Sequence, residues 1–223
     1  MASGFPGSID NFTDPLSNSS LSSPSHAGQH ADLNDAVEKI ETYMGLVKVI
    51  PTSVSTGNTL AANGTITIGS ARSEIIVDGC FTSLYDNYRL VVTGTTPSSN
   101  TLWQCQWRSG ASTVNAANYQ HAALRIDSTG TTYNFGANGQ TYNETAVNIY
   151  STINGNGFTY DVFSPYLAQE TAGQVSGAGT LTGVSLALCA TRYGASTSIT
   201  GFRLYPAAGT VTGGTIRVYG YRN

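Results

Sequence analysis

Seven acidic side chains in the C-terminal two-thirds of the sequence are the groups that a hydrolytic enzyme would need. A glycosidase works with two carboxylates at a defined separation, one as acid and one as base or nucleophile. The seven are Glu74, Asp78, Asp86, Asp127, Glu144, Asp161 and Glu170. None falls in a recognisable pair, and Asp78-Gly79 and Asp127-Ser128 are typical of turns. We therefore expect no catalytic carboxylates.

The positions of the histidines likewise do not match a known catalytic motif. A Ser-His-Asp triad would depend on His121, and the sequence has no Gly-x-Ser-x-Gly elbow. His26 and His30 are four residues apart, which on a helix would place two imidazoles on one face for a metal. Gly28 and a helix start after it favour a non-helical segment instead. We expect no enzyme activity, no metal site and no cofactor.

The three cysteines are Cys80, Cys105 and Cys189, an odd number at wide spacing that matches no metal knuckle. Each lies among apolar or aromatic neighbours. They are either three buried free thiols or one disulfide with a spare thiol. The N-terminus has neither a charged n-region nor an apolar h-region, so we expect no secretory signal and folding in a reducing cytoplasm.

The composition is that of a polar but nearly uncharged β-protein. The 223 residues include 25 glycines, and only 10% are charged, against about 25% in ordinary globular proteins. Lys39 and Lys48 are the only lysines, and the eight arginines are scattered, so nucleic acid is not an expected partner. No apolar run approaches the roughly 20 residues that span a bilayer.

One segment has helical periodicity. Its apolar residues follow the 4-3-4-3 spacing of a heptad repeat, at Leu33, Val37, Ile40, Met44 and Val47. Asp32 is the predicted N-cap, and Gly45 suits the residue that ends a helix. We assign residues 32–50 to a short helix and its junction.

Such a helix is too short to be stable alone, so its apolar stripe must pack on something. It lies either on its own chain or against copies of itself. A tail-like segment precedes it and strands follow it, which favours self-association through Leu33, Val37, Ile40 and Met44.

Residues 1–31 are rich in Ser, Gly, Pro, Asn and Asp and cannot bury a core. The segment is either disordered or laid extended on a partner. Phe5, Phe12 and Leu16, with prolines nearby, favour an extended arm with three anchor points.

The rest of the chain reads as a 51–70 linker with a first strand at 65–68, followed by an all-β region at 71–223. Frequent Asn-Gly and Gly-Gly turns predict an antiparallel β-sandwich, in particular a jelly roll. Gly173 to Gly183 is expected to be a flexible hairpin or loop. We expect strands at 74–77, 88–93, 101–108, 147–151, 158–163, 184–190, 198–205 and 215–221, and a strand or short helix at 119–126.

Aromatic and neutral polar residues suit a binding role. Thirteen tyrosines and abundant Asn, Ser, Thr and Gln provide the stacking surfaces and hydrogen bonders that sugars require. We predict that residues 133–142 form a presented loop tip. Its candidate receptor- or glycan-binding residues are Tyr133, Asn134, Phe135, Asn138 and Tyr142.

Both ends of the chain contain stretches that resemble a known family. Residues 8–15 (SIDNFTDP) and 25–41 (SHAGQHADLNDAVEKIE) look like the N-terminal region of tail fibre and minor tail proteins of phages that infect Gram-positive, especially actinobacterial, hosts. Residues 81–89 (FTSLYDNYR), 164–166 (SPY) and 213–221 (GGTIRVYGY) resemble the head domains of such fibres.

The resemblance implies a homotrimeric virion protein, made in the host cytoplasm. Residues 1–31 would dock to other virion proteins, the helix would trimerise, and the β-domain would bind host surface polysaccharide. Gly45 ends the helix after about three turns and no Gly-X-Y repeat follows, so a short fibre is implied. A capsid-decorating or adaptor trimer without a receptor site is the alternative, and a wall-polysaccharide hydrolase is a remote third.

Overall fold

The fold comes from a computed structural model, which describes residues 26–43, 45–151, 156–180 and 184–222. The chain divides into two compact units. The first extends to Gly45 and contains the helix α1, His26–Tyr43. The second, Leu46–Tyr221, contains the strands. Each unit is described by itself.

The helix is longer at its start than the sequence predicts. It begins at His26, so Asp32 lies inside it, and the prediction that Asp32 is the N-cap is wrong. Residues 26–31 are likewise helical and not part of an extended arm. Gly28 is tolerated because an isolated glycine costs a helix only about 1 kcal/mol. Gly45 follows the helix with a φ of +83°, which confirms its role at the helix end.

The apolar stripe of α1 is exposed at Leu33, Val37 and Ile40. Val47 is not a heptad position, because it lies in the strand β1 (Leu46–Val49). Met44 and the predicted docking residues Phe5, Phe12 and Leu16 lie outside the described residues. Among the described helices none is long and apolar enough to cross a membrane.

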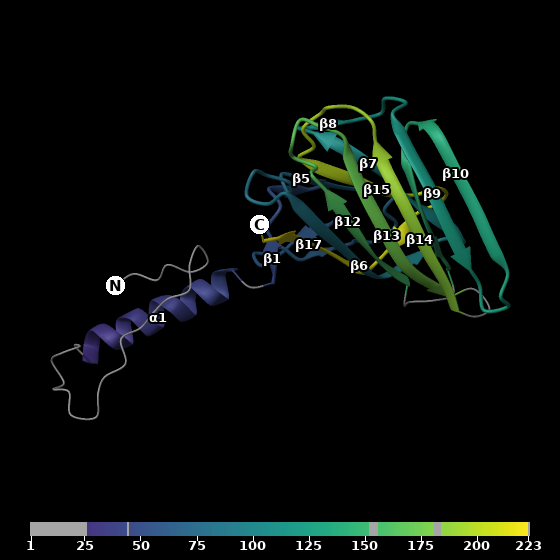
Figure 1. The fold of residues 1–223 in the computed structure, drawn as a ribbon. Coiled ribbons are helices and arrows are strands. Elements are labelled where there is room, and N and C mark those ends of the chain that lie inside the picture. The colour runs from purple at the N-terminus through teal and green to yellow at the C-terminus, as the bar shows by residue number, and fades with distance from the viewer. Residues whose placement is uncertain (1–25, 44, 152–155, 181–183, 223) are drawn as a thin grey trace. The chain divides into compact units, whose positions relative to one another are not determined.

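The second unit is built from two antiparallel sheets, which confirms the mainly β, sandwich-like prediction (Figure 1). The larger has 11 strands. Its main path is β10 (Thr132–Gln140), β9 (Tyr119–Ile126), β14 (Val184–Tyr193), β13 (Thr171–Thr180), β12 (Asn156–Phe163), β6 (Asn87–Pro97), β17 (Thr215–Tyr221), β4 (Ile66–Thr67) and β3 (Thr59–Leu60). Off this path, β1 pairs with β17, and β16 (Val211–Thr212) pairs with β6.

The smaller sheet has six strands. Its order is β11 (Asn143–Ile149), β7 (Thr101–Ser109), β15 (Gly201–Pro206), β5 (Ile75–Asp78) and β2 (Ser53–Val54), with β8 (Ser112–Thr113) paired to β7. The strand β11 packs over β13, β14 and β9 of the larger sheet.

Aromatic side chains join the two sheets. Trp103 and Trp107 of β7 are buried and lie 6.2 Å and 5.5 Å, centroid to centroid, from Phe158 and Tyr160 of β12. The sequence predicted a strand at 101–108, and the period-two alternation of that strand places Trp103, Cys105 and Trp107 on its inward face. Cys80, Cys105 and Cys189 are all buried and free, which confirms the first of the two cysteine readings.

The β-unit starts earlier and contains more strand than the sequence indicates. β1 pairs with β17 from Leu46 onward, so 46–70 is part of the sandwich and not a junction and linker. Residues 119–126 are a strand, β9. Of the two predictions for 173–183, a hairpin or a loop, the described part agrees with the hairpin, because residues 173–180 belong to β13, which pairs antiparallel with the next strand, β14. β13 also pairs with β12 and is therefore a central strand.

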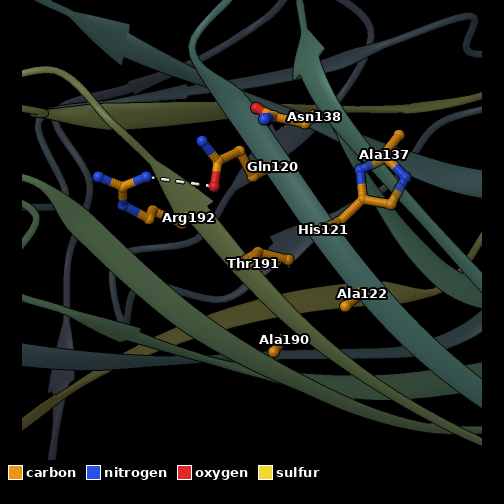
Figure 2. A pocket seen from close by; sticks show the side chains of 8 residues that line it. All are labelled: Gln120, His121, Ala122, Ala137, Asn138, Ala190, Thr191 and Arg192. Carbon is orange, nitrogen blue, oxygen red and sulfur yellow. Dashed lines mark hydrogen bonds between the residues drawn. The ribbon is translucent and has the colours of Figure 1, made fainter.

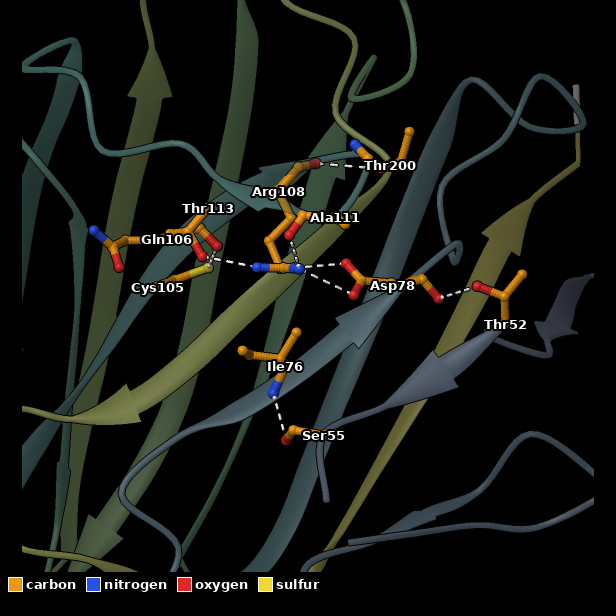
Figure 3. A network of polar contacts seen from close by, with 11 residues as sticks. Thr52, Ser55, Ile76, Asp78, Cys105, Gln106, Arg108, Ala111, Thr113 and Thr200 are labelled. Carbon is orange, nitrogen blue, oxygen red and sulfur yellow. Dashed lines mark hydrogen bonds and ion pairs between the residues drawn. The ribbon is translucent and has the colours of Figure 1, made fainter. Parts of the chain in front are cut away.

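A buried arginine ties three strands of the smaller sheet together (Figure 3). Arg108 of β7 donates Nε and Nη2 to the two carboxylate oxygens of Asp78 on β5, at 2.5 and 3.1 Å. Nη2 also donates to the Ala111 carbonyl at 2.6 Å, and Nη1 donates to Thr113 Oγ1 on β8 at 2.8 Å. The role of Arg108 is structural, since all three of its guanidinium nitrogens donate hydrogen bonds within the fold.

Candidate functional site

The predicted loop tip at 133–142 is an edge strand. The strand β10 pairs with β9 on one side, and among the described residues no strand pairs with its other side. The Asn138-Gly139 signal marks a bulge and not a hairpin turn, because the register slips between Ala137 and Gln140 and Gly139 has a φ of +67°. Edge strands with bulges are common near binding sites.

The five predicted binding residues do not share one surface, because side chains alternate between the two faces of a strand. Tyr133 and Phe135 share one face of β10, and Asn134 lies on the other. Asn138 lies at the bulge, and Tyr142 lies between β10 and β11, half-buried. The structure thus brings together only two of the five, Tyr133 and Phe135.

The face that holds Tyr133 and Phe135 also holds residues that the sequence did not single out for binding. Arg125 of β9 is directly opposite Tyr133, and its guanidinium lies 4.4 Å from the tyrosine ring centroid. The ring of Phe135 lies 6.4 Å from that of His121, two positions further along this face. We call Tyr133, Phe135, Arg125, His121 and the neighbouring Glu144 of β11 the aromatic strip.

The aromatic strip is only partly covered. β11 packs over β9, and β10 is the next strand outward, at the edge of the sheet (Figure 1). Tyr133 keeps 41% of its surface exposed, Phe135 is half-buried, and His121 is buried. Exposure along the aromatic strip therefore increases from His121, which is buried, to Tyr133, which lies at the open edge of the sheet.

The ionisable groups of the strip are shifted by burial. Burial lowers the pKa of His121, whose Nδ1 accepts a hydrogen bond from the Glu144 amide at 3.4 Å, so the imidazole is neutral at pH 7. Burial raises the pKa of Glu144, and the positive charge of Arg125 opposes that shift. The strip thus presents one guanidinium and one carboxylate beside its two aromatic rings.

At the exposed end of the aromatic strip, hydrogen bonds within the β9–β10 turn stabilise the negative charge of Asp127. The Tyr133 hydroxyl donates to Asp127 Oδ2 at 3.5 Å. Hydrogen bonds, first from the Thr129 hydroxyl and then from the Thr131 and Thr129 amides, lower the pKa of Asp127. Asp127 therefore anchors the β9–β10 turn as a carboxylate, as its turn signal suggested.

The opposite face of the same strands is hollowed (Figure 2). A pocket of about 290 Å³ is lined by Gln120, His121, Ala122, Ala137, Asn138, Ala190, Thr191 and Arg192. Ala122 and Ala190 are directly opposite each other on β9 and β14, and their small side chains leave the space. Arg192 closes one end, donating to Gln120 Oε1 at 3.1 Å and to Glu170 Oε2 at 2.8 Å.

Most of the acidic residues weighed for hydrolysis are bound to arginines. Bidentate or single ion pairs join Asp78 to Arg108, Asp161 to Arg89, Glu170 to Arg192 and Glu74 to Arg203. Among the described residues, no group of three His, Cys, Asp or Glu side chains is placed to hold a metal ion. The groups gathered in the aromatic strip can stack and hydrogen-bond, and they include one guanidinium and one carboxylate.

The sequence contained a pattern that indicates His121 and Arg125, two residues of the aromatic strip that were not predicted to bind. Within 119–126, His121 and Arg125 are four positions apart, an even spacing, so a strand assignment alone places them on one face. Their closeness to Tyr133 required the β9–β10 register.

No protein-family model matches the chain, and no curated protein matches it.

Proposed function

We propose that this chain is a structural virion protein, a short trimeric tail fibre or receptor-binding protein of a phage. Its N-terminal residues attach it to the particle, the helix stripe at Leu33, Val37 and Ile40 trimerises as a coiled coil, and the jelly-roll-like β-unit binds host surface glycan. The motifs at both ends support the virion assignment, and the exposed apolar stripe of α1 supports self-association.

The observation that carries the glycan assignment is Tyr133. It is a large aromatic side chain held in the open on an edge strand, with its ring oriented by Arg125 and its hydroxyl by Asp127. Rigid aromatics with a polar tip bind sugars at low entropic cost, because the ring stacks on C–H faces while neighbouring groups hydrogen-bond hydroxyls. Arg125 and Glu144 supply the neighbouring donor and acceptors.

The test is binding of the full chain to an array of Gram-positive wall and capsule polysaccharides. We expect Tyr133→Ala to weaken binding by about tenfold or more, since truncation of an anchoring aromatic costs more than about 1 kcal/mol. Phe163→Ala is the matched control, because Phe163 is 40% exposed but lies on β12, away from the strip. Equal binding by both variants, or no polysaccharide bound by the parent chain, would contradict the glycan assignment.

The alternative is a capsid-decorating or adaptor trimer with no receptor site. It is favoured by the same exposed helix stripe, which requires copies of the chain but no receptor. The two functions differ in what blocks infection: a receptor-binding protein added in excess protects host cells, whereas a decorating trimer does not.

A further inference from the structure

The sequence contains four Asn-Gly pairs, a dipeptide whose two residues can react with each other. The backbone nitrogen of the glycine attacks the side-chain amide carbon of the asparagine, and a glycine nitrogen is the least shielded because it has no neighbouring Cβ. The pairs begin at residues 63, 138, 154 and 156, and the one at 154 lies outside the described residues. The fold decides which of the other three can react.

The pair at Asn63 is exposed but held by hydrogen bonds. Asn63 Oδ1 accepts from the Thr65 amide at 3.0 Å, and the Gly64 amide donates to the Ala61 carbonyl at 2.8 Å. Gly64 is itself buried. The side chain of Asn63 therefore cannot turn onto the glycine nitrogen without breaking both bonds.

The pair at Asn156 is buried inside the larger sheet. Asn156 is 1% exposed, and its Nδ2 donates to the Thr95 and Tyr150 carbonyls at 3.0 and 3.2 Å. Gly157 is paired on both sides, with β6 and with β13. Reaction at this pair requires the centre of the sheet to open, which costs close to the full free energy of unfolding.

The pair at Asn138 has neither kind of protection. Asn138 and Gly139 are both exposed, and the β9–β10 register passes from Ala137 to Gln140 without pairing either of them. No hydrogen bond from a described residue restrains the side-chain amide of Asn138 (Figure 2). Gly139 has a φ of +67°, and a bulge on an edge strand opens at little cost.

We propose that Asn138 is a site of spontaneous deamidation in the folded protein. The Gly139 nitrogen bonds to the Asn138 side-chain carbon, the bond from that carbon to Nδ2 breaks, and ammonia leaves with the amide proton. Water then adds to either carbonyl of the cyclic imide and opens it, which yields aspartate or isoaspartate at position 138. Water is the only co-reactant, and nothing is oxidised or reduced.

The reaction changes the charge and the pairing of this edge. Asn138 lines the pocket that also contains Gln120 and Arg192, so a carboxylate appears beside a guanidinium that is already paired with Glu170. Isoaspartate also lengthens the main chain by one carbon at the point where the register slips. The β10 edge of the β-unit therefore acquires negative charge as the protein ages.

The test is incubation of the full chain at physiological temperature in mildly alkaline buffer, followed by peptide mapping. Chymotrypsin cuts after aromatic residues, so residues 136–142 form one short peptide for mass spectrometry. We expect Asn138 to be converted at least tenfold faster than Asn63 and Asn156. In urea the three rates should become similar, because the dipeptide is the same and only the fold distinguishes them.

Two glycine variants separate the chemistry from backbone strain. Gly139→Ala should slow the conversion of Asn138 at least tenfold, since its Cβ shields the attacking nitrogen. Gly130→Ala is the matched control, because Gly130 also has a positive φ, of +80°, and open space at its Cβ, but it does not follow an asparagine. It should react at Asn138 at the parent rate.

An independent readout is charge. The aged parent chain should contain a more acidic species that elutes from an anion-exchange column with the Asn138→Asp variant. In the folded chain, conversion of Asn63 or Asn156 as fast as Asn138, or no conversion of Asn138 while the urea-unfolded chain reacts there, would overturn the proposal. Neither result bears on the glycan assignment, which is tested at Tyr133.

Discussion

At Asp161 two side chains from neighbouring strands decide the charge of one carboxylate. Arg89 Nε and Nη2 donate to its two oxygens at 2.7 Å each, and the Tyr221 hydroxyl donates at 2.6 Å. Burial alone would raise the pKa of Asp161, but these hydrogen bonds and the charge of Arg89 outweigh it and lower the pKa below 3.8. Burial, then the bond to Asp161, raises the pKa of Tyr221 to about 12.

This shift predicts a pH dependence of stability. The folded pKa of Asp161 lies below its unfolded value, so its stabilisation is present above pH 4 and is lost as pH falls through the folded pKa. We expect Asp161→Asn to reduce the gain in unfolding free energy between pH 3 and pH 7, and to cost about 1 kcal/mol at pH 7, because the pair is partly exposed. Urea denaturation at the two pH values measures both.

The control for Asp161 is Glu38→Gln, an exposed acidic residue of α1 outside the β-unit. It should leave the pH profile of the β-unit unchanged. An Asp161→Asn profile parallel to that of the parent chain would contradict the linkage.

Tyr133 shows how far single residues could be read without a structure. Its type and its neighbours suggested an exposed aromatic, and it is exposed. Its setting in a loop was wrong, because Asn-Gly and Gly residues are as compatible with a bulged edge strand as with a turn. Its stacking partner Arg125 follows only from the pairing of β10 with β9.

At the scale of single elements, the strand β13 fits at its position in the larger sheet because of its glycines. Gly173 and Gly177 face the interior, where a Cβ at Gly177 would stand 2.6 Å from Val147 Cγ2 and 2.9 Å from Phe158 Cβ. The glycine-rich composition that suggests a loop is here a packing requirement, since β11 passes closely over this strand.

We therefore expect Gly177→Ala to destabilise the β-unit by about 1–3 kcal/mol through overpacking, although alanine normally favours folding over glycine. Chemical denaturation measures the change. Ser176→Ala, one residue away on the exposed face, should stay within about 0.5 kcal/mol of the parent. A neutral or stabilising Gly177→Ala would show that β11 does not press on β13.

The helix carries a separate prediction. Val37→Asp with Ile40→Asp places two charges on the exposed stripe of α1, so association of the chain should weaken by at least tenfold, because a buried coiled-coil seam rejects charge. Light scattering on dilution measures it. The control is Ala31→Asp with Asn34→Asp, which adds the same charge outside the stripe and should dissociate at the same concentration as the parent chain. If the Val37→Asp/Ile40→Asp variant also dissociates at that concentration, the helix does not self-associate.

At the scale of the β-unit, the two sheets present different outer faces. The smaller sheet carries ion pairs and amides, with Arg203 held by Glu74 and Gln106 and stacked 4.2 Å from the Tyr205 centroid. The larger sheet carries small residues and the exposed side chains of Leu124, Ile126, Leu186 and Leu188. The aromatic strip lies on the inward side of the larger sheet at its β10 edge.

By itself the sequence determined the β class, a strand at 101–108 and one helix, which it started at Asp32 instead of His26. Each follows from local composition or from a clear period of alternation. Only the tertiary structure decided that 46–49, 132–140 and 171–180 are strands and which residues meet in the aromatic strip. Large apolar side chains are few in 132–140 and 171–180, and 46–49 is only four residues long, so the conformation of all three depends on hydrogen bonds supplied by neighbours far away in the chain.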